Sequence, residues 1–364
     1  MHWSPEQDAA LKETARWLKS GDGQVFRLFG YAGTGKTTLA RHLAEAVDGG
    51  VVFAAFTGKA AHVMRMKGCA GASTIHSLIY RARGEDEDGP TFALNQDSAA
   101  ADAGLIVIDE CSMVDAEIGR DLLSFGKPVL VLGDPAQLPP VAGGGFFTDA
   151  EPDVMLSTVH RQAEDNPIIR MSMRVREGKQ LDYGAYGESR VIPRDDIDAD
   201  AILATDQILV GLNRTRRLYN ARIRELHGRD GPVPVAGDTL VCLRNDRKRG
   251  LINGSVWQID NVRKPRKGLL RYTLSPEEGS GGRRRTVVSI HPAFFEGTAE
   301  ALPFAERRKS DEFDFGYALT VHKAQGSQWP DVVLFNESPA FREHRSRWLY
   351  TGITRAAERL TVVQ

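Results

Sequence analysis

The sequence predicts an α/β protein whose parallel sheets are covered by helices on both faces. Three observations support this fold class. Short apolar runs alternate with stretches of helical periodicity, a glycine loop joins the first apolar run to a helix, and polar residues follow the ends of these runs. In such doubly wound sheets the ligand binds at the carboxyl ends of the strands. The 364 residues are enough for two or three domains, each with its own core.

The first part of the chain alternates predicted helices and strands. Ser4 is suited to cap a helix that has Pro5 at its first position. Apolar runs then predict strands at 25–29, 51–56, 105–108 and 129–132. Because each of these runs ends in glycine or polar residues, the sequence places a ligand at their common edge.

The glycine loop follows the first of these strands. Gly30, four further residues and then Gly35, Lys36 and Thr37 match the phosphate-binding loop, with a strand before it and a helix, residues 36–47, after it. Such a loop turns its N–H groups towards an anion, while the lysine reaches the β and γ phosphates and the threonine ligates magnesium. The sequence therefore predicts a nucleoside triphosphate site.

A carboxylate pair follows the third strand. Asp109 and Glu110 are suited to hold magnesium and to position the attacking water, respectively, in nucleotide hydrolysis. Gln137 follows the next strand and is a candidate sensor of the γ-phosphate. A carboxylate pair alone often only caps a helix, but behind a phosphate loop in the same sheet it indicates hydrolysis.

The segment from Arg81 to Ser98 is acidic and rich in turn residues, with too few apolar side chains for a core. We predict a short inserted hairpin there. After the glycines at 143–145 the α/β pattern restarts, which indicates a second domain that begins with a strand at 154–156. Short β-type runs from Pro232 to Asp311 then predict a small barrel inserted into that domain.

The overall charge is close to neutral. The chain has 47 basic and 48 acidic side chains, for a formal net charge of −1 at pH 7. This balance excludes a protein coated in positive charge but not a local basic channel, which a polyanion needs. Basic residues gather in short runs between Gly237 and Asp311, either as a solvated face or as a contact with nucleic acid.

No apolar run is long enough to span a membrane, and residues 1–20 are polar and lack a signal-peptide core. We therefore expect a cytoplasmic protein without a membrane partner. Cys69, Cys111 and Cys242 are far apart and form no pattern. They predict neither a disulfide nor a zinc site, and we interpret them as small buried hydrophobes.

Taken in order, the motifs resemble those of superfamily 1 helicases, in particular the RecD/Dda-like subclass that moves 5′ to 3′ on DNA. The motifs are Gln7, GYAGTGKT, FTGKAA, STIH, VIDECSMV, VLGDPAQLPPV, HRQ, YALTVHKAQGSQW and YTGITRA. The resemblance covers nearly the whole chain. It implies two RecA-like P-loop domains with parallel sheets, a strand-separating hairpin (the pin) in the first, and a small SH3-like β-barrel in the second. The implied bounds are 1–142 for the first domain with the pin at about 81–99, 143–235 with 313–364 for the second, and 236–312 for the barrel.

The resemblance also implies roles for single residues. The residues implied to act in hydrolysis are Lys36, Asp109, Glu110, Gln137, Arg161 and Arg355. The two arginines are implied to act as arginine fingers that stabilise the transition state. The residues implied to hold the nucleotide are Gln7, Gly30, Ala32, Gly33, Thr34, Gly35, Lys36, Thr37, Thr38 and Gly326. Among them, Gln7 is implied to read the adenine base. Thr37 and Asp109 are the implied magnesium ligands. Those implied to contact single-stranded DNA are Phe56, Thr57, Lys59, Thr74, His76, Phe92, Thr320, His322, Lys323 and Ser327.

Three positions depart from the family pattern. Phe56 stands where proline is usual, so this aromatic ring either stacks on a base or packs in the core. Gln328 stands where glutamate is common, which puts a ribose contact there in doubt. Phe92 is the only aromatic residue of a short acidic pin, so duplex opening is expected to be weaker than translocation.

The sequence therefore predicts an ATP-dependent DNA helicase of replication, recombination or repair that uses ATP and Mg²⁺. The predicted partners are single-stranded DNA, duplex junctions and a single-strand-binding, replication or recombination protein. We expect a monomer in the cytoplasm, associated with the nucleoid or, for a viral source, in the host cytoplasm. An RNA helicase, a protein-displacing translocase and a non-catalytic ATP-gated DNA-binding subunit remain as alternatives.

Overall fold

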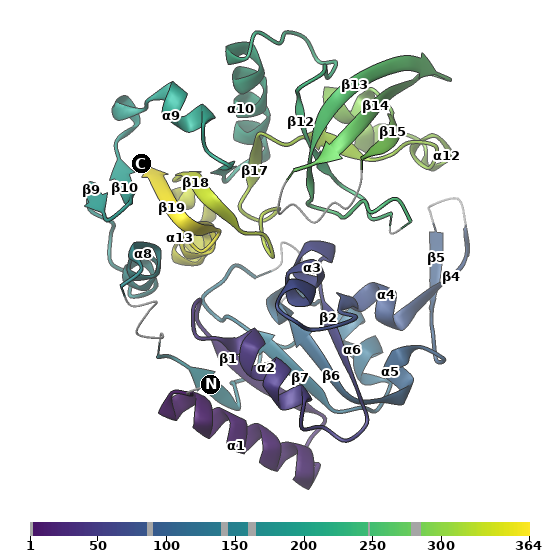
Figure 1. Ribbon diagram of the computed structural model, residues 1–364, viewed down its shortest axis with the longest axis vertical. Helices are drawn as coiled ribbons and strands as arrows, with labels where there is room; N and C mark the ends of the chain where they lie inside the picture. The colour runs from purple at the N-terminus through teal and green to yellow at the C-terminus, as the bar shows by residue number, and fades with distance from the viewer. Residues whose placement is uncertain (1–2, 86–89, 140–144, 159–164, 247, 278–284) are drawn as a thin grey trace. The chain divides into compact units, whose positions relative to one another are not determined.

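The computed structural model describes residues 3–85, 90–139, 145–158, 165–246, 248–277 and 285–364. These form two compact units (Figure 1). The first holds the described residues of Met1–Asp86, Pro90–Gln180 and Ser346–Thr354; the second holds those of Leu181–Arg345 and Arg355–Gln364. Among the described helices, none combines the length and the apolar character that a membrane crossing needs. The domain bounds drawn from the sequence remain a prediction.

The first unit is built on a sheet in which every pair of neighbouring strands is parallel. Its strands, in spatial order, are β3 (Ser73–Thr74), β2 (Gly50–Ala55), β6 (Ala103–Asp109), β7 (Val129–Gly133), β1 (Val25–Gly30) and β8 (Val154–Leu156). β7 is buried throughout, as expected for a strand with helices on both faces. β8 corrects the sequence prediction, which placed 154–156 in the second domain. Leu28 pairs with Val154 and Gly30 with Leu156, so β8 completes the first sheet.

Helices cover both faces of this sheet. They are α1 (Pro5–Ser20), α2 (Lys36–Ala44), α3 (Gly58–Met66), α4 (Ile75–Ile79), α5 (Ala99–Asp102), the 3₁₀ turn η1 (Cys111–Met113) and α6 (Ala116–Leu123). The same unit also holds α8 (Pro167–Arg176) and most of α13 (Arg345–Ile353). Alternate residues of β6 enter two separate cores, since Val107 packs with α2 and α3 whereas Ile106 packs with α4 and α6. This alternation fixes the register of the strand.

A hairpin leaves the first unit where the acidic segment predicts an insertion. β4 (Tyr80–Glu85) and β5 (Pro90–Leu94) pair in antiparallel fashion, with Ala82 opposite Phe92. Phe92 is 47% exposed. Its ring meets the ring of His76 edge-on at 4.4 Å between centroids, which ties the hairpin to the start of α4. A role for this hairpin in strand separation remains a prediction.

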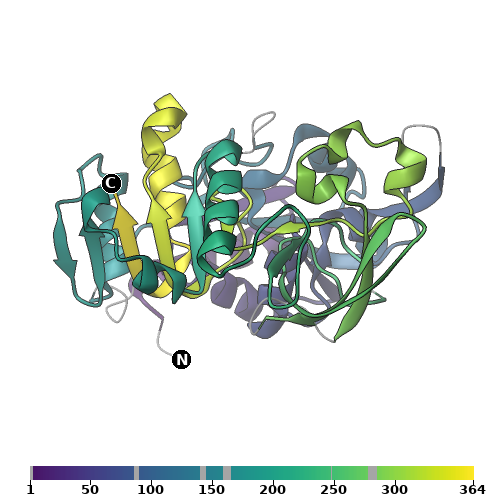
Figure 2. The same ribbon diagram turned by 90° about the horizontal axis from the view of Figure 1, so that it is seen from above.

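The second unit contains another sheet of parallel strands, with one antiparallel strand at its edge. In spatial order its strands are β17 (Ala318–Thr320), β11 (Gln207–Val210), β18 (Trp329–Phe335), β19 (Ala356–Val363), β10 (Ser189–Ile192) and β9 (Gly184–Tyr186). In Figure 2 the yellow strands β18 and β19 lie side by side in this sheet. The helices are α9 (Ala199–Leu203), α10 (Asn213–Leu226) and the 3₁₀ segments η2 (Arg194–Asp196) and η4 (Ser338–His344). These two sheets confirm the predicted α/β class.

Inserted between α10 and β17 is an antiparallel sheet, green in Figure 2. Its strands are β15 (Thr286–Ile290), β14 (Leu269–Pro276), β13 (Val256–Arg266), β12 (Thr239–Cys242) and β16 (Phe313–Phe315). The short helices α11 (Ala293–Glu296), η3 (Ala299–Ala301) and α12 (Phe304–Arg307) follow β15. The predicted barrel ended at residue 312, but β16 also belongs to this sheet because Leu240 pairs with Phe315.

Candidate nucleotide-binding site

The phosphate loop follows β1 and leads into α2. Gly33 and Gly35 have φ angles of 80° and 82°, which only glycine adopts without strain. Gly30 is required for another reason, since a Cβ there would lie 2.7 Å from Thr34 Oγ1 and 2.8 Å from Leu156 Cβ. The backbone thus turns tightly at the N-terminus of a helix, where N–H groups and the helix dipole favour an anion.

Lys36 is the first residue of α2, and its side chain turns back over the loop. Its Nζ donates to the carbonyl oxygens of Gly30 at 2.6 Å and Tyr31 at 3.0 Å. The loop therefore holds the ammonium beside the N–H groups that would face a phosphate. Ala32, Thr34 and Thr38 lie on the same loop or the first turn of α2, as predicted from the motif.

Thr37 meets the carboxylate pair at the edge of the sheet. The Thr37 hydroxyl donates to Asp109 Oδ2 at 2.9 Å, and the backbone N–H of Glu110 donates to Asp109 Oδ1 at 2.8 Å. A hydroxyl and a carboxylate are hard oxygen donors of the kind that Mg²⁺ takes alongside substrate phosphates. These two residues therefore fit the predicted magnesium site.

Glu110 has an unusual backbone. Its φ and ψ are 55° and 45°, in the left-handed region, although it is not glycine. Such a conformation costs on the order of 1 kcal/mol or more and persists where the surrounding structure enforces it, often at functional sites. The strain turns the chain sharply between β6 and η1, immediately after the carboxylate of Asp109.

Gln137 carries a polar atom without a visible partner. The residue is 8% exposed, and its Oε1 is buried without a hydrogen-bond partner among the described residues. Leaving such an acceptor unpaired costs about 1–3 kcal/mol, so a ligand or water is expected to satisfy it. This observation supports the predicted role of Gln137 near the nucleotide.

Tyr350 on α13 joins the loop to Asp134, a contact that the sequence analysis missed. Its hydroxyl donates to Asp134 Oδ2 at 2.6 Å and accepts from the Ala32 N–H at 2.9 Å. Burial, and then the nearby charge of Asp134, raise the pKa of the Tyr350 phenol, which therefore stays protonated as the donor. The residue belongs to the YTGITRA motif, but nothing in that motif indicates its partners.

Arg176, at the end of α8, is a second residue that the sequence analysis missed. Its guanidinium carbon lies 3.6 Å from the centroid of the Tyr31 ring, within the phosphate loop. Its Nη1 is buried and has no hydrogen-bond partner within the described ranges. No sequence motif marks this position, and only the fold brings it to the loop.

Gln7 lies beside the loop but is already engaged. Its Nε2 donates to the Thr34 carbonyl at 3.0 Å, and its Oε1 accepts from the Ser4 N–H at 3.1 Å in a capping box at the start of α1. In this arrangement Gln7 fixes the loop to α1. Adenine reading by Gln7 remains a prediction.

The two predicted arginine fingers differ in what can be said of them. Arg161 lies outside the described residues. Arg355, in the second unit, is 5% exposed and donates from Nη1 to the Ser327 carbonyl at 3.0 Å. The adjacent Gly326 has a φ of 73°. Arg355, Ser327 and Gly326 therefore lie together, although they come from two separate motifs.

Several predicted strand-contact residues of the first unit cap helices. The Thr57 hydroxyl accepts from the Ala60 N–H at 3.1 Å, and Thr74 caps α4 in the same manner. Lys59 is only 3% exposed, so it does not present an open ammonium to a strand. Phe56 packs against the core, which favours the packing interpretation of this departure from the family. Partial burial of the ring lowers the pKa of His76.

In the second unit, the predicted strand contacts follow β17. Thr320 and Ser327 are 5% and 3% exposed, whereas Lys323 is exposed. The ring of His322 lies 5.6 Å from that of Phe341. Burial lowers the pKa of His322, and His344 nearby lowers it further. Lys323 is thus the most accessible cation of this set.

Comparison with known proteins agrees with these features. A family model described as an AAA domain matches residues 2–193, and one described as a UvrD-like helicase C-terminal domain matches residues 315–363. The chain is 29% identical to the ATP-dependent RecD2 DNA helicase of Deinococcus radiodurans, over 91% of this chain and 46% of that protein. It is 32% identical to the ATP-dependent DNA helicase dda of Enterobacteria phage T4, over 41% of this chain and 37% of that protein. The chain thus spans less than half the length of these relatives.

Solved structures share the fold. The Pif1 helicase from Candida albicans superposes with a TM-score of 0.57 at 17% identity, covering 100% of this chain and 95% of that one. Bacteroides Pif1 bound to ssDNA gives a TM-score of 0.58 at 18% identity, covering 99% and 92%. The AAA domain model alone matches more than half of the 364 residues, and the helicase C-terminal model follows it in the expected order. The chain therefore belongs to the superfamily 1 helicases of the RecD/Dda-like group.

Proposed function

We propose that this chain is an ATP-driven DNA helicase that moves 5′ to 3′ along a single strand and opens the duplex ahead of it. The observation that carries the proposal is the hydrogen bond of 2.9 Å between Thr37 and Asp109, beside the phosphate loop. It joins the two halves of a hydrolysis site that lie far apart in the sequence. Membership of the RecD/Dda-like group supports DNA as the track and 5′ to 3′ as the direction.

The proposed chemistry is transfer of the γ-phosphoryl group to water. The loop N–H groups and Lys36 hold the phosphates, and Glu110 orients the water and accepts its proton. Thr37 and Asp109 would hold Mg²⁺, which would supply positive charge against the negative charge that develops on the phosphates. Arg355 and Arg161 would stabilise the transition state, and Gln137 would sense the γ-phosphate.

The strand would be held by both units. Thr57, Thr74 and His76 are the proposed contacts from the first, and His322 and Lys323 those from the second. Hydroxyls and cations suit this task because they bind phosphates without reading sequence. Alternating grip by the two halves, timed by ATP binding and hydrolysis, would move the chain along the strand. We propose that the moving parts follow the predicted bounds 1–142, 143–235 with 313–364, and 236–312, except that β8 moves with the first sheet and β16 with the inserted sheet.

The remaining proposals concern the setting. We propose that the chain acts as a monomer in the cytoplasm, on single strands and at duplex junctions of replication, recombination or repair. The β4–β5 hairpin would be the pin, with Phe92 as its exposed aromatic ring.

Unwinding of two partial duplexes, one with a 5′ tail and one with a 3′ tail, tests the proposal while ATP turnover is followed in the same tubes. Opening of the 5′-tailed duplex alone is the expected result. If neither duplex opens while single strands still stimulate ATP turnover, the chain is a translocase. Displacement of streptavidin from a biotinylated strand then tests whether it removes bound proteins. Stimulation by RNA but not by DNA would overturn the choice of track.

A further inference from the structure

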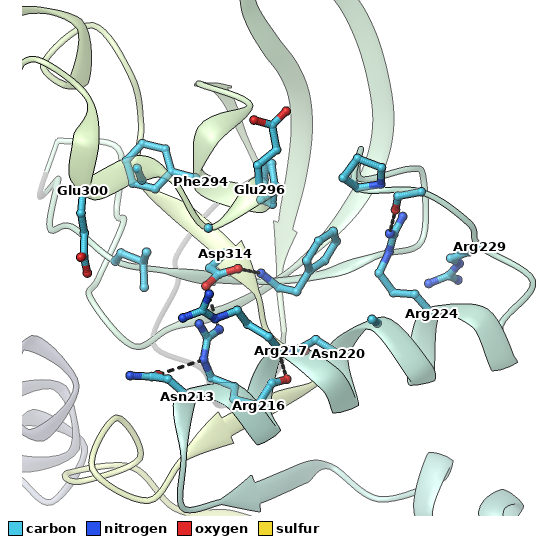
Figure 3. A pocket seen from close by; sticks show the side chains of 18 of the residues that line it. Asn213, Arg216, Arg217, Asn220, Arg224, Arg229, Phe294, Glu296, Glu300 and Asp314 are labelled. Atoms are coloured by element: carbon cyan, nitrogen blue, oxygen red, sulfur yellow. Dashed lines mark hydrogen bonds and ion pairs between the residues drawn. The ribbon is translucent and has the colours of Figure 1, made fainter.

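The second unit contains a cavity of about 640 Å³ that no part of the proposed hydrolysis site uses. One wall is a face of α10, and the other is the inserted segment from Phe294 to Glu300 (Figure 3). Asp314 and Phe315 of β16, together with Lys323, also line it. The cavity therefore reaches a residue already proposed to hold the strand.

Some polar side chains of the α10 wall serve the fold. Asn220 donates to the Ala318 carbonyl at 3.0 Å and accepts from the Ala318 N–H at 3.0 Å, which fixes α10 to β17. Arg224 is 3% exposed and pairs with Asp238, whose side chain is fully buried. These groups already have partners, so they are not available to a ligand.

Two cations of the cavity have no such partners. The Arg217 guanidinium is exposed, and neither it nor the Lys323 ammonium forms a hydrogen bond or ion pair with any residue that the structure describes. Gly297 lets Arg217 lie close to the opposite wall, because its φ is 75° and a Cβ there would come within 3.2 Å of Arg217 Nη1. The Asn213 side chain lies one turn before Arg217 on the same wall, as Figure 3 shows.

Positive charge exceeds negative charge at this end of the cavity. Arg216 pairs with Asp314 at 2.7 Å, whereas neither the Arg217 guanidinium nor the Lys323 ammonium forms an ion pair with a carboxylate in the described part of the chain. Enclosure by the protein lowers the pKa of Lys323, and Arg216 lowers it further, with Asp314 acting in the opposite sense. An anion beside Lys323 would offset the repulsion that Arg216 exerts on it.

The opposite wall has a different character. Phe295 lines the cavity, and its ring lies 5.2 Å from that of Phe315. Glu296 and Glu300, which also line the cavity, are exposed (Figure 3). Carboxylates repel a second phosphate, while an aromatic surface favours a flat ring. The chemistry thus matches one phosphate joined to one nucleoside.

We propose that this cavity seats one nucleotide of the single DNA strand, with its backbone phosphate between Arg217 and Lys323 and its nucleoside against Phe295. This inference rests on the proposed function, because it assumes that the strand reaches Lys323. It adds Arg217, Asn213 and Phe295 to the strand contacts. A phosphate bound in this cavity would be more enclosed by protein than one bound on a flat surface of the second unit.

Binding of a fluorescein-labelled oligothymidylate over a range of salt concentrations tests whether the cavity holds a nucleotide of the strand. We expect R217A to weaken binding about tenfold and to reduce the slope of log K against log salt by about 0.7, the contribution of one phosphate on a single strand. R217K should restore most of the affinity and the slope. F295L should weaken binding while leaving the slope as it is, since it removes no charge.

R222A is the matched control, because it removes the same charge from α10 at an exposed arginine that pairs with Glu225, at 2.9 Å, and does not line the cavity. It should bind like the unaltered chain. Equal affinity and slope for R217A and R222A would overturn the seat and leave the proposed function standing. Failure of the unaltered chain to bind any oligonucleotide would overturn both.

Discussion

The nucleotide site of the first unit and the cavity of the second solve different binding problems. Around the phosphate loop, several polar side chains already bond other protein groups, as Tyr350 does with Asp134 and Ala32. In the cavity, Arg217 and Lys323 face open volume. A site that performs chemistry gains from fixed donors, because they need no reorganisation in the transition state. A site that must grip and release repeatedly gains from cations that exchange phosphate for solvent ions.

The largest expected effect is that of replacing the loop lysine. We expect K36A to lower ATP hydrolysis by about 10³-fold or more, because the transition state loses its closest fixed cation. Phosphate release under saturating ATP is the measurement. Oligonucleotide binding should be retained, since Lys36 lies at the loop and its ammonium bonds the Gly30 and Tyr31 carbonyl oxygens. Near-normal turnover would refute the site.

Replacing Glu110 tests whether the strained residue is the base. E110Q keeps the shape and removes the charge, so kcat should fall about 10²- to 10⁴-fold while nucleotide affinity stays the same. E117Q makes the same chemical change on an exposed first-turn residue of α6 and should behave like the unaltered chain. Equal kcat for the two variants would remove Glu110 from the mechanism.

Tyr350 tests how far the bonded network stabilises the first unit. Y350F leaves the buried Asp134 carboxylate and the Ala32 N–H without their partner, so the free energy of unfolding should fall by about 1–3 kcal/mol. Urea denaturation followed by tryptophan fluorescence measures this. Tyr183 is 60% exposed, so Y183F is the control and should change stability little. A stable Y350F would show that water replaces the hydroxyl.

Arg176 lies against Tyr31 of the phosphate loop, and its buried Nη1 has no hydrogen-bond partner among the residues described. R176A should raise the KM for ATP about fivefold, through loss of its stacking on Tyr31 and of the contact that its Nη1 would make. R170A, at an exposed position of the same helix, should leave KM unchanged. If both variants match the unaltered chain, Arg176 only packs.

The smallest expected effect concerns His76. Because its pKa is lowered in the folded chain, the unfolded chain binds the proton more readily, and acidification through and below about pH 6.5 should destabilise the fold. H76Q should lose less unfolding free energy than the unaltered chain between pH 7.5 and pH 5.5. Parallel pH profiles for the two chains would contradict this origin of the pH dependence.

The sequence predicted best those features that depend on neighbours in the chain. The loop from Gly30 to Thr37 is local, since its glycines, its strand and its helix are contiguous. The placement of Asp109 beside Thr37 also followed, because parallel strands bring their carboxyl ends to one edge. Two sheets of parallel strands confirm the fold class inferred from this logic.

Features that depend on distant partners were missed or misplaced. β8 has three residues, and only its pairing with β1 shows to which sheet it belongs. Tyr350 and Asp134 are 216 positions apart, so no spacing rule links them. Arg176 is one of many arginines until the fold sets it on Tyr31. Lys59 looks like an exposed base in a polar motif, yet its side chain is buried.

The pairing of β12 with β16 has a consequence for how this chain tolerates change. The inserted sheet begins at Thr239 and ends at Phe315, and Leu240 lies directly opposite Phe315. Entry and exit are therefore about one strand spacing apart, roughly 5 Å. Gly316 fits there because a Cβ would come within 2.9 Å of the Leu240 backbone. For the parallel sheet of the second unit, the whole insertion therefore takes the place of one tight turn. A short linker between the two ends of the insertion should suffice to connect the chain when the insertion is removed.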